Sequence, residues 1–254
     1  MDVLMRSAVS VPVNRAVAVL RPARLLALAA LLLLATGCAT TKSFSSVSNL
    51  EPSTNSATPL KIALMPLDVQ LSILTAGGTL EPQADWTRDA KDNMISALQR
   101  LGRVRNNDFI VYQEPAQLDA TARKILEIER LHRAVGQSIL FHKYLVPLPT
   151  KKSAFDWTLG PEVSVLHDQT GADYALFIHV EDSYSSKGRI FMQLAAAALG
   201  IGLQGGQQAG FTSLVDLHSG NIVWFNFINN PAGDLRTPKP AEKTVQLLLK
   251  GLPE

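Results

Sequence analysis

The sequence predicts an α/β fold, in which helices cover a mixed sheet that includes an antiparallel hairpin near the C-terminus. From residue 60 onward, short apolar runs alternate with stretches whose apolar residues recur at helical spacing. Near the C-terminus, the strand-like residues 210–217 and 221–228 are joined by three residues that end in Gly220, a pattern typical of a tight hairpin. We therefore expect one α/β domain over residues 60–254, with a signal peptide and a flexible tether before it.

The first half of this domain contains two expected strands and two expected helices. The strands are apolar runs bounded by turn residues, and each helix has one apolar stripe. In order they are residues 60–67 (strand), 84–101 (helix), 108–113 (strand) and 118–135 (helix). Asp119 is expected to cap the second helix. Residues 68–83, with Gly77 and Gly78, are expected to form a long connection.

The second half begins with a short expected helix over residues 161–170, with Pro161 in its first turn and Gly171 as its C-terminal cap. Residues 173–181 are an expected strand. The hairpin follows, and a helix over residues 241–249 closes the chain.

The N-terminal residues 1–37 resemble a secretory signal peptide. Residues 25–34 are an unbroken run of leucine and alanine, preceded by Arg21 and Arg24 and followed by small residues. Ten residues are too few for a membrane-spanning helix, which needs about 20. An uncleaved N-terminal anchor is the alternative, and Met5 is an alternative start.

Cys38 is the only cysteine in the chain, so no disulfide can form within it. The five residues that end at Cys38 resemble the bacterial lipobox, although Ala35 stands where leucine is usual. The resemblance implies that Cys38 carries lipid and becomes the mature N-terminus. In lipoproteins of the enteric type, a residue such as Ala39 in place of aspartate implies the outer membrane. We therefore expect a protein anchored by lipid on the periplasmic face of that membrane.

Residues 38–59 are expected to be a flexible tether. Of the 21 residues from 39 to 59, 14 are serine, threonine, asparagine or proline, too polar a composition to form a core. A flexible chain of this length reaches roughly 25 Å. An ordered arm on the domain is the alternative.

The charge does not indicate a nucleic-acid partner. The whole chain has a net charge of +2. Residues 1–37 contain four arginines and one aspartate, and without them 20 basic and 21 acidic side chains remain. The basic excess therefore belongs to the leader.

The motifs that carry chemistry are absent or out of context, and we expect no enzyme, cofactor or metal site. Gly200, Gly202 and Gly205 match the dinucleotide-binding pattern G-x-G-x-x-G, but an alanine-rich run precedes them and a strand follows, the reverse of the required order. The five histidines have no close metal-binding spacing. His179 and Glu181 share one face of a strand, a geometry compatible with acid–base catalysis but more simply explained as a polar sheet edge.

Residues 190–203 form a stretch of 14 residues without a charge, rich in alanine. It is too short to span a bilayer as a helix. Three interpretations stay open: a core helix, a contact with a protein or a membrane surface, and a barrel hairpin. As a partner or self-association surface it would present Ile190, Phe191, Leu194, Ala196, Leu199 and Leu203.

The region from Gly171 to the C-terminus resembles the curli secretion lipoprotein (CsgG) type, and more loosely the N-terminal domain of TolB and the lipoprotein activators of penicillin-binding proteins. Gly171 to Tyr174 lead into a strand, a glycine-rich insertion follows, and residues 215–224 match a hairpin pattern V-D-x-x-T/S-G-x-I-x-W. The resemblance implies a periplasmic α/β domain on a lipid anchor that serves an envelope assembly or export machine.

Two functions follow from this resemblance. The first is a non-catalytic adaptor or assembly factor that binds an unidentified envelope protein or itself, as a homo-oligomer. The second is a subunit of a CsgG-like secretion pore. That pore uses two membrane hairpins per subunit, whereas residues 183–210 could supply only one here, because residues 229–240 are short and proline-rich. We therefore expect the adaptor.

Overall fold

The computed structural model describes residues 40–45, 60–105, 108–115, 117–151, 155–231 and 233–253. Its strands are β1 (Thr40–Ser45), β2 (Lys61–Leu64), β3 (Asp68–Leu74), β4 (Leu80–Pro82), β5 (Asp108–Val111), β6 (Tyr174–Ser185), β7 (Gln208–Asp216) and β8 (Ile222–Asn230). Its helices are α2 (Ala84–Arg105), α3 (Ala120–Tyr144), α4 (Ser164–Thr170), α5 (Lys187–Ala198) and α6 (Pro238–Leu248), with short 3₁₀ turns η1 (Pro149–Lys151) and η2 (Pro161–Val163).

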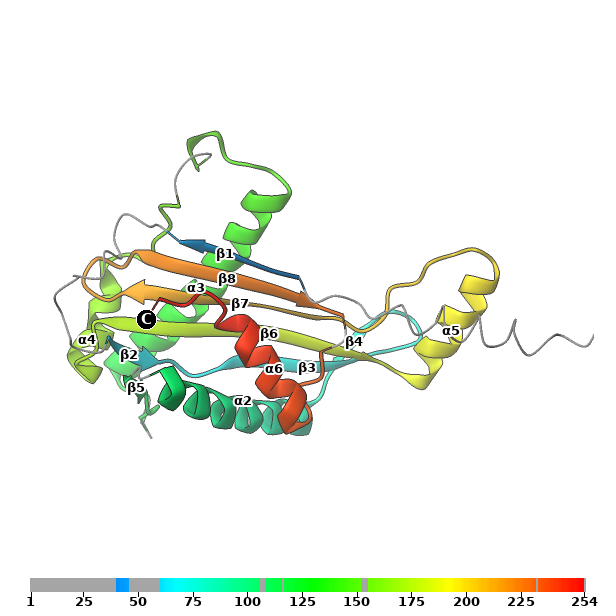
Figure 1. Ribbon diagram of the computed structural model, residues 1–254, viewed down its shortest axis with the longest axis horizontal. Coiled ribbons are helices and arrows are strands. Elements are labelled where there is room, and N and C mark those ends of the chain that lie inside the picture. The colour runs from blue at the N-terminus through cyan, green and yellow to red at the C-terminus, as the bar shows by residue number, and fades with distance from the viewer. Residues whose placement is uncertain are drawn as a thin grey trace, which may run out of the picture. The chain divides into compact units, whose positions relative to one another are not determined.

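The strands form one mixed sheet in the order β1-β8-β7-β6-β2-β5 (Figure 1). Strand β6 is its central element. Its first residues pair in parallel with β2, and its later residues pair in parallel with β3, which in turn pairs with β4. Along its other edge, β6 pairs antiparallel with β7 over nine residues. Strand β6 is therefore paired in parallel along one edge and antiparallel along the other.

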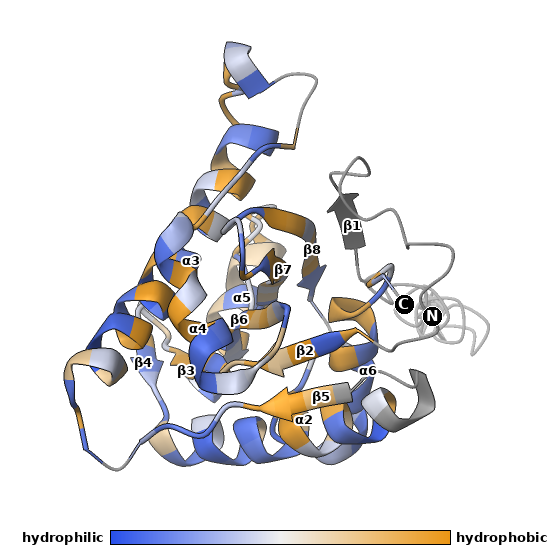
Figure 2. Cartoon of the chain, turned by 90° about the vertical axis from the view of Figure 1, so that its left-hand side faces the viewer, coloured by the Kyte–Doolittle hydropathy of each residue, from blue (hydrophilic) through white to orange (hydrophobic). Residues whose placement is uncertain are grey.

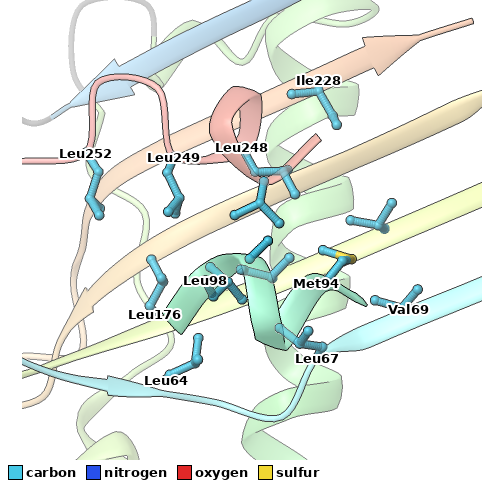
Figure 3. Packing of buried hydrophobic residues seen from close by; sticks show 14 of the residues in the cluster. Leu64, Leu67, Val69, Met94, Leu98, Leu176, Ile228, Leu248, Leu249 and Leu252 are labelled. Carbon is cyan, nitrogen blue, oxygen red and sulfur yellow. The ribbon is translucent and has the colours of Figure 1, made fainter. Parts of the chain in front are cut away.

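Helices cover both faces of this sheet, and alternate residues of each strand meet different helices. On one face, Met94 and Leu98 of α2 and Leu248 of α6 pack against Leu176 and Ile228 of the sheet (Figure 3). On the other face lie α3 and α4, whose buried residues join a second cluster: Ile125, Ile128, Ile139 and Leu166 pack with Phe177, Phe211 and Phe225. Hydrophobic and hydrophilic residues alternate along α2 and α3 (Figure 2), as expected for helices with one buried side.

The predicted fold class is confirmed. The Asp119 side chain accepts a hydrogen bond from the backbone N–H of Ala122, so it caps α3 as expected. Gly171 ends α4 in the left-handed conformation, with φ of 66°. Strands β7 and β8 form the predicted hairpin, and their Trp224 is 1% exposed.

The expected long connection over residues 68–83 is wrong, because strands β3 and β4 occupy most of it. Strand β3 pairs with residues 179–185 of β6, which is longer than expected and continues past Glu181 to Ser185. Helix α3 also continues nine residues beyond its expected end at residue 135, to Tyr144.

The expected tether contains a strand. Residues Thr40–Ser45 form β1, which pairs antiparallel with β8 at one edge of the sheet. These six residues therefore belong to the sheet, as in the alternative of an ordered arm. Cys38 and residues 46–59, like the signal peptide, lie outside the described residues.

Candidate functional site

The uncharged stretch forms most of α5 and the loop after it, and this unit extends beyond the end of the sheet (Figure 1). Helix α5 begins at Ser186, whose hydroxyl accepts a hydrogen bond from the backbone N–H of Arg189. No residue of α5 is buried. The interpretation as a core helix is therefore wrong, and the interpretation as a barrel hairpin does not match the helical backbone.

The proposed contact residues are mostly open to solvent. Phe191 is 69% exposed, Leu194 67% and Leu199 78%, and Ile190 is also exposed. Ala196 and Leu203 are half-buried. Two large residues that the sequence analysis did not single out, Met192 and Ile201, are exposed as well. We call residues 187–203 the α5 arm.

The loop after α5 folds back and is bonded to it. The Arg189 guanidinium donates two hydrogen bonds to the carbonyl oxygen of Gln204, at 3.0 and 2.7 Å. The Gln193 amide donates to the carbonyl of Leu203. Gly200, with φ of 77°, reverses the chain after the helix. A helix comes before these glycines and strand β7 after them, so they close a loop and do not lead a strand into a helix.

The start of β1 lies at the same end of the sheet as the α5 arm. Thr40 pairs with Asn229, which pairs with Ala209, which pairs with Glu181, four residues before β6 ends. Strand β1 thus runs away from the α5 arm, and its first residue lies level with Glu181, near the end of β6. Cys38 is two residues before Thr40, so these two steps extend the chain by about 7 Å at most.

A hollow of about 530 Å³ lies at the base of the α5 arm. Its wall combines Gln70 and Ser72 of β3, Glu181 of β6, Arg189 and the loop residue Gln204. Polar side chains from four segments therefore converge there.

Among the described helices, none is long and apolar enough to cross a membrane.

His179 and Glu181 belong to a charged cluster with Asp68 and Arg133. His179 Nδ1 lies 2.7 Å from Asp68 Oδ2, and its Nε2 lies 3.5 Å from Glu181 Oε1. Arg133 Nε donates to Asp68 Oδ2 at 2.6 Å. Burial alone would lower the pKa of His179, but the hydrogen bonds to the two carboxylates more than offset it, so this pKa is raised. Each group is thus held by an opposite charge, as expected for an ion-pair network between α3 and the sheet.

Two neighbours on α3 have perturbed pKa values for other reasons. Burial, with repulsion from Glu114 and Asp68, raises the pKa of Glu129 to about 7. Its buried Oε1 atom has no hydrogen-bond partner. Burial lowers the pKa of His132 to about 3, and His132 Nε2 lies 2.9 Å from the Ser213 hydroxyl. Both members of this serine–histidine pair are buried, so a substrate in solvent does not reach the hydroxyl.

A third cluster lies at the opposite end of the sheet, where His167, Asp173 and His218 meet. Sequence reasoning missed it, because the three residues come from separate segments and match no short metal-binding spacing. Only the pairing of β6 with β7 brings Asp173 and His218 together.

No family model and no curated protein matches the chain. Among solved structures, it is similar to the PelC dodecamer from Paraburkholderia phytofirmans, with 15% identity, 84% of this chain and 95% of that chain covered, and a TM-score of 0.36. A variant of that dodecamer in another crystal form gives 12% identity, the same coverage and a TM-score of 0.35. Similarities with so low an identity and TM-score do not indicate a function. The function therefore has to be inferred from the residues of this chain.

Proposed function

We propose that the protein is a lipid-anchored, non-catalytic adaptor on the periplasmic face of the outer membrane, with its α5 arm lying in the membrane surface. The lipid on Cys38 and the arm together would fix one end of the sheet at the bilayer. The helices on both faces of the sheet would then be available to an envelope partner. The resemblance to the curli secretion lipoprotein type implies service to an envelope assembly or export machine, and an adaptor is one form of that service.

The observation that carries the proposal is that Thr40 and the α5 arm lie at the same end of the sheet. Because Cys38 is two residues from Thr40, its lipid would hold this end close to the bilayer. An arm at the opposite end would be about 40 Å away, the length of a 12-residue strand such as β6.

The chemistry of the arm suits a membrane surface. Phe191, Leu194 and Leu199 are apolar and exposed. From residue 183 to residue 215 the chain contains no acidic residue, and Lys187 and Arg189 are its only charges. Apolar side chains with basic residues at one end are typical of helices that lie in the headgroup region, where each basic residue near an anionic surface adds about 1 kcal/mol.

A non-catalytic role is supported by the state of the reactive groups. His179 and its carboxylates bond to one another, and the Ser213 hydroxyl is buried. The helical backbone of α5 also does not favour the secretion pore, for which this segment would have to supply a membrane hairpin.

Vesicle flotation tests the membrane contact separately from the lipid. The chain from residue 39 onward, which lacks both the apolar leader and Cys38, should bind vesicles of phosphatidylethanolamine and phosphatidylglycerol through the arm alone. Phe191→Ser or Leu194→Ser should lower the partition coefficient about tenfold or more, because burying such a side chain stabilises binding by about 1.5–3 kcal/mol. Phe141→Ser is the matched control, since Phe141 is a phenylalanine of α3 that is 48% exposed.

Two results would contradict the membrane contact. One is an equal loss of binding with Phe141→Ser. The other is an arm variant that leaves flotation unchanged but dissociates an oligomer in light scattering, which would make the arm a self-association surface. Crosslinking in intact cells tests the adaptor role: an attached envelope protein supports it, and a ring-sized oligomer of this chain alone favours the pore.

A further inference from the structure

Two histidines and one aspartate meet at the end of the sheet opposite the α5 arm. His167 comes from α4, Asp173 immediately precedes β6, and His218 lies in the turn between β7 and β8. One ligand atom from each residue lies within 4.8 Å of those of the other two. The two imidazole rings are 4.7 Å apart between centroids. The side chains of His218 and Asp173 are 63% and 50% exposed, so a small ion can reach them.

The ring of His167 is oriented by the backbone. Its Nδ1 lies 2.7 Å from the carbonyl oxygen of Ala172. A carbonyl only accepts, so Nδ1 carries the proton, and the neutral ring then has its lone pair on Nε2. Histidines that bind metals usually donate their other ring N–H in this way, to a carbonyl or a carboxylate.

Hydrogen bonds of the backbone fix the positions of the other two residues, Asp173 and His218. The N–H of Leu217, next to His218, donates to the carbonyl of Asp173 at 3.0 Å. The Asp216 carboxylate accepts from the N–H of His218 at 2.8 Å. Gly220 fixes the same turn, because its φ is 75° and an added Cβ would lie 2.0 Å from the carbonyl oxygen of Gly160. The spacing of the three side chains is therefore set by the fold.

We propose that His167, Asp173 and His218 bind one divalent first-row transition metal ion, for which Zn²⁺ is the probe. Two imidazole nitrogens and one carboxylate oxygen are a common donor set for such ions, and water completes the tetrahedron. His218 Nε2 and Asp173 Oδ1 are 3.6 Å apart. Two donors on a common tetrahedral zinc ion, each about 2.0–2.1 Å from it, are about 3.3 Å apart, so this pair needs only a small rotation, and the His167 donor, within 4.8 Å of the other two, has to move about 1.5 Å closer at most. The ion would join α4, β6 and the hairpin.

Calorimetric titration of the whole chain in detergent with Zn²⁺ tests the site. The expected result is one ion per chain, with binding weakened at least about tenfold by His167→Gln or His218→Gln. His142→Gln is the matched control, because His142 Nδ1 also lies near a backbone carbonyl, that of Val146 at 2.9 Å, but outside this cluster. Its affinity should equal that of the unmodified chain.

A second measurement separates loss of a ligand from loss of the fold. Zn²⁺ should raise the melting temperature of the unmodified chain and of the His142 variant, but not that of the His218 variant. Circular dichroism should show the same secondary structure in all three. The proposal is overturned if the His167 and His218 variants bind Zn²⁺ as tightly as the unmodified chain, if His142→Gln weakens binding equally, or if no stoichiometric binding occurs below about 100 µM.

Discussion

Replacing Glu129 by glutamine should stabilise the protein at alkaline pH and change little at acid pH. Burial and two neighbouring carboxylates raise the pKa of Glu129 from 4.5 to about 7. The folded state therefore binds a proton more tightly than the unfolded state does. The resulting penalty is absent below about pH 4.5, grows as the pH rises, and is complete above about pH 7.

The size of the effect follows from the shift in pKa. A shift of about 2.5 units corresponds to about 3.4 kcal/mol at most, at 1.36 kcal/mol per unit. Glu129 is only partly buried, and Lys91 and Arg130 oppose the shift. Solvent screening then reduces the expected gain to about 1–2 kcal/mol at pH 8.

Urea denaturation from pH 5 to pH 8 measures this gain. The midpoint of Glu129→Gln should exceed that of the unmodified chain by about 0.5 M or more at pH 8, and the difference should fall to about a quarter of that at pH 5. His179, whose pKa is also raised, stabilises the fold at low pH and loses this contribution as the pH rises through its folded pKa. It does so in both proteins, so its effect cancels in the difference. A difference that is independent of pH, or a variant less stable at pH 8, would refute the reasoning.

Two further predictions concern the anchor and the hairpin. Cys38→Ser should abolish labelling of the protein by radioactive or clickable fatty acid in growing cells, and undiminished label would end the idea of lipidation. Trp224→Ala should lower the free energy of unfolding by about 3–5 kcal/mol, since Trp224 is 1% exposed in the larger core cluster. A loss below about 1 kcal/mol in chemical denaturation would mean that the hairpin is peripheral.

The sequence predicts elements best where local chemistry decides them. The caps Asp119 and Gly171 act within a few residues of their own helices, and both were predicted correctly. Strand β6 was expected to end at Glu181, but it continues to Ser185. Asp182 is buried there because Gln208 and the backbone N–H of Leu235 donate to it. Those partners come from distant segments, so neither the length of β6 nor its pairing with β3 is visible locally.

The candidate sites, like the strands, could be predicted only where a local pattern in the sequence marks them. The sequence singled out residues 190–203 because the absence of charge over 14 residues is a local property. Whether such a helix is buried depends on what packs against it, and only the structure shows Phe191 and Leu194 exposed. The cluster of His167, Asp173 and His218 gives no local signal at all, because it depends on the register between two strands.

The pairing of β1 with β8 has a consequence for the order of folding. Thr40 pairs with Asn229, near the opposite end of the chain, so β1 cannot join the sheet before the C-terminal hairpin exists. Until then, the free edge of β8 exposes unpaired backbone groups that can pair with another chain. A truncated chain that begins at residue 60 keeps this open edge permanently. Such a fragment should therefore aggregate more readily than the chain that retains β1.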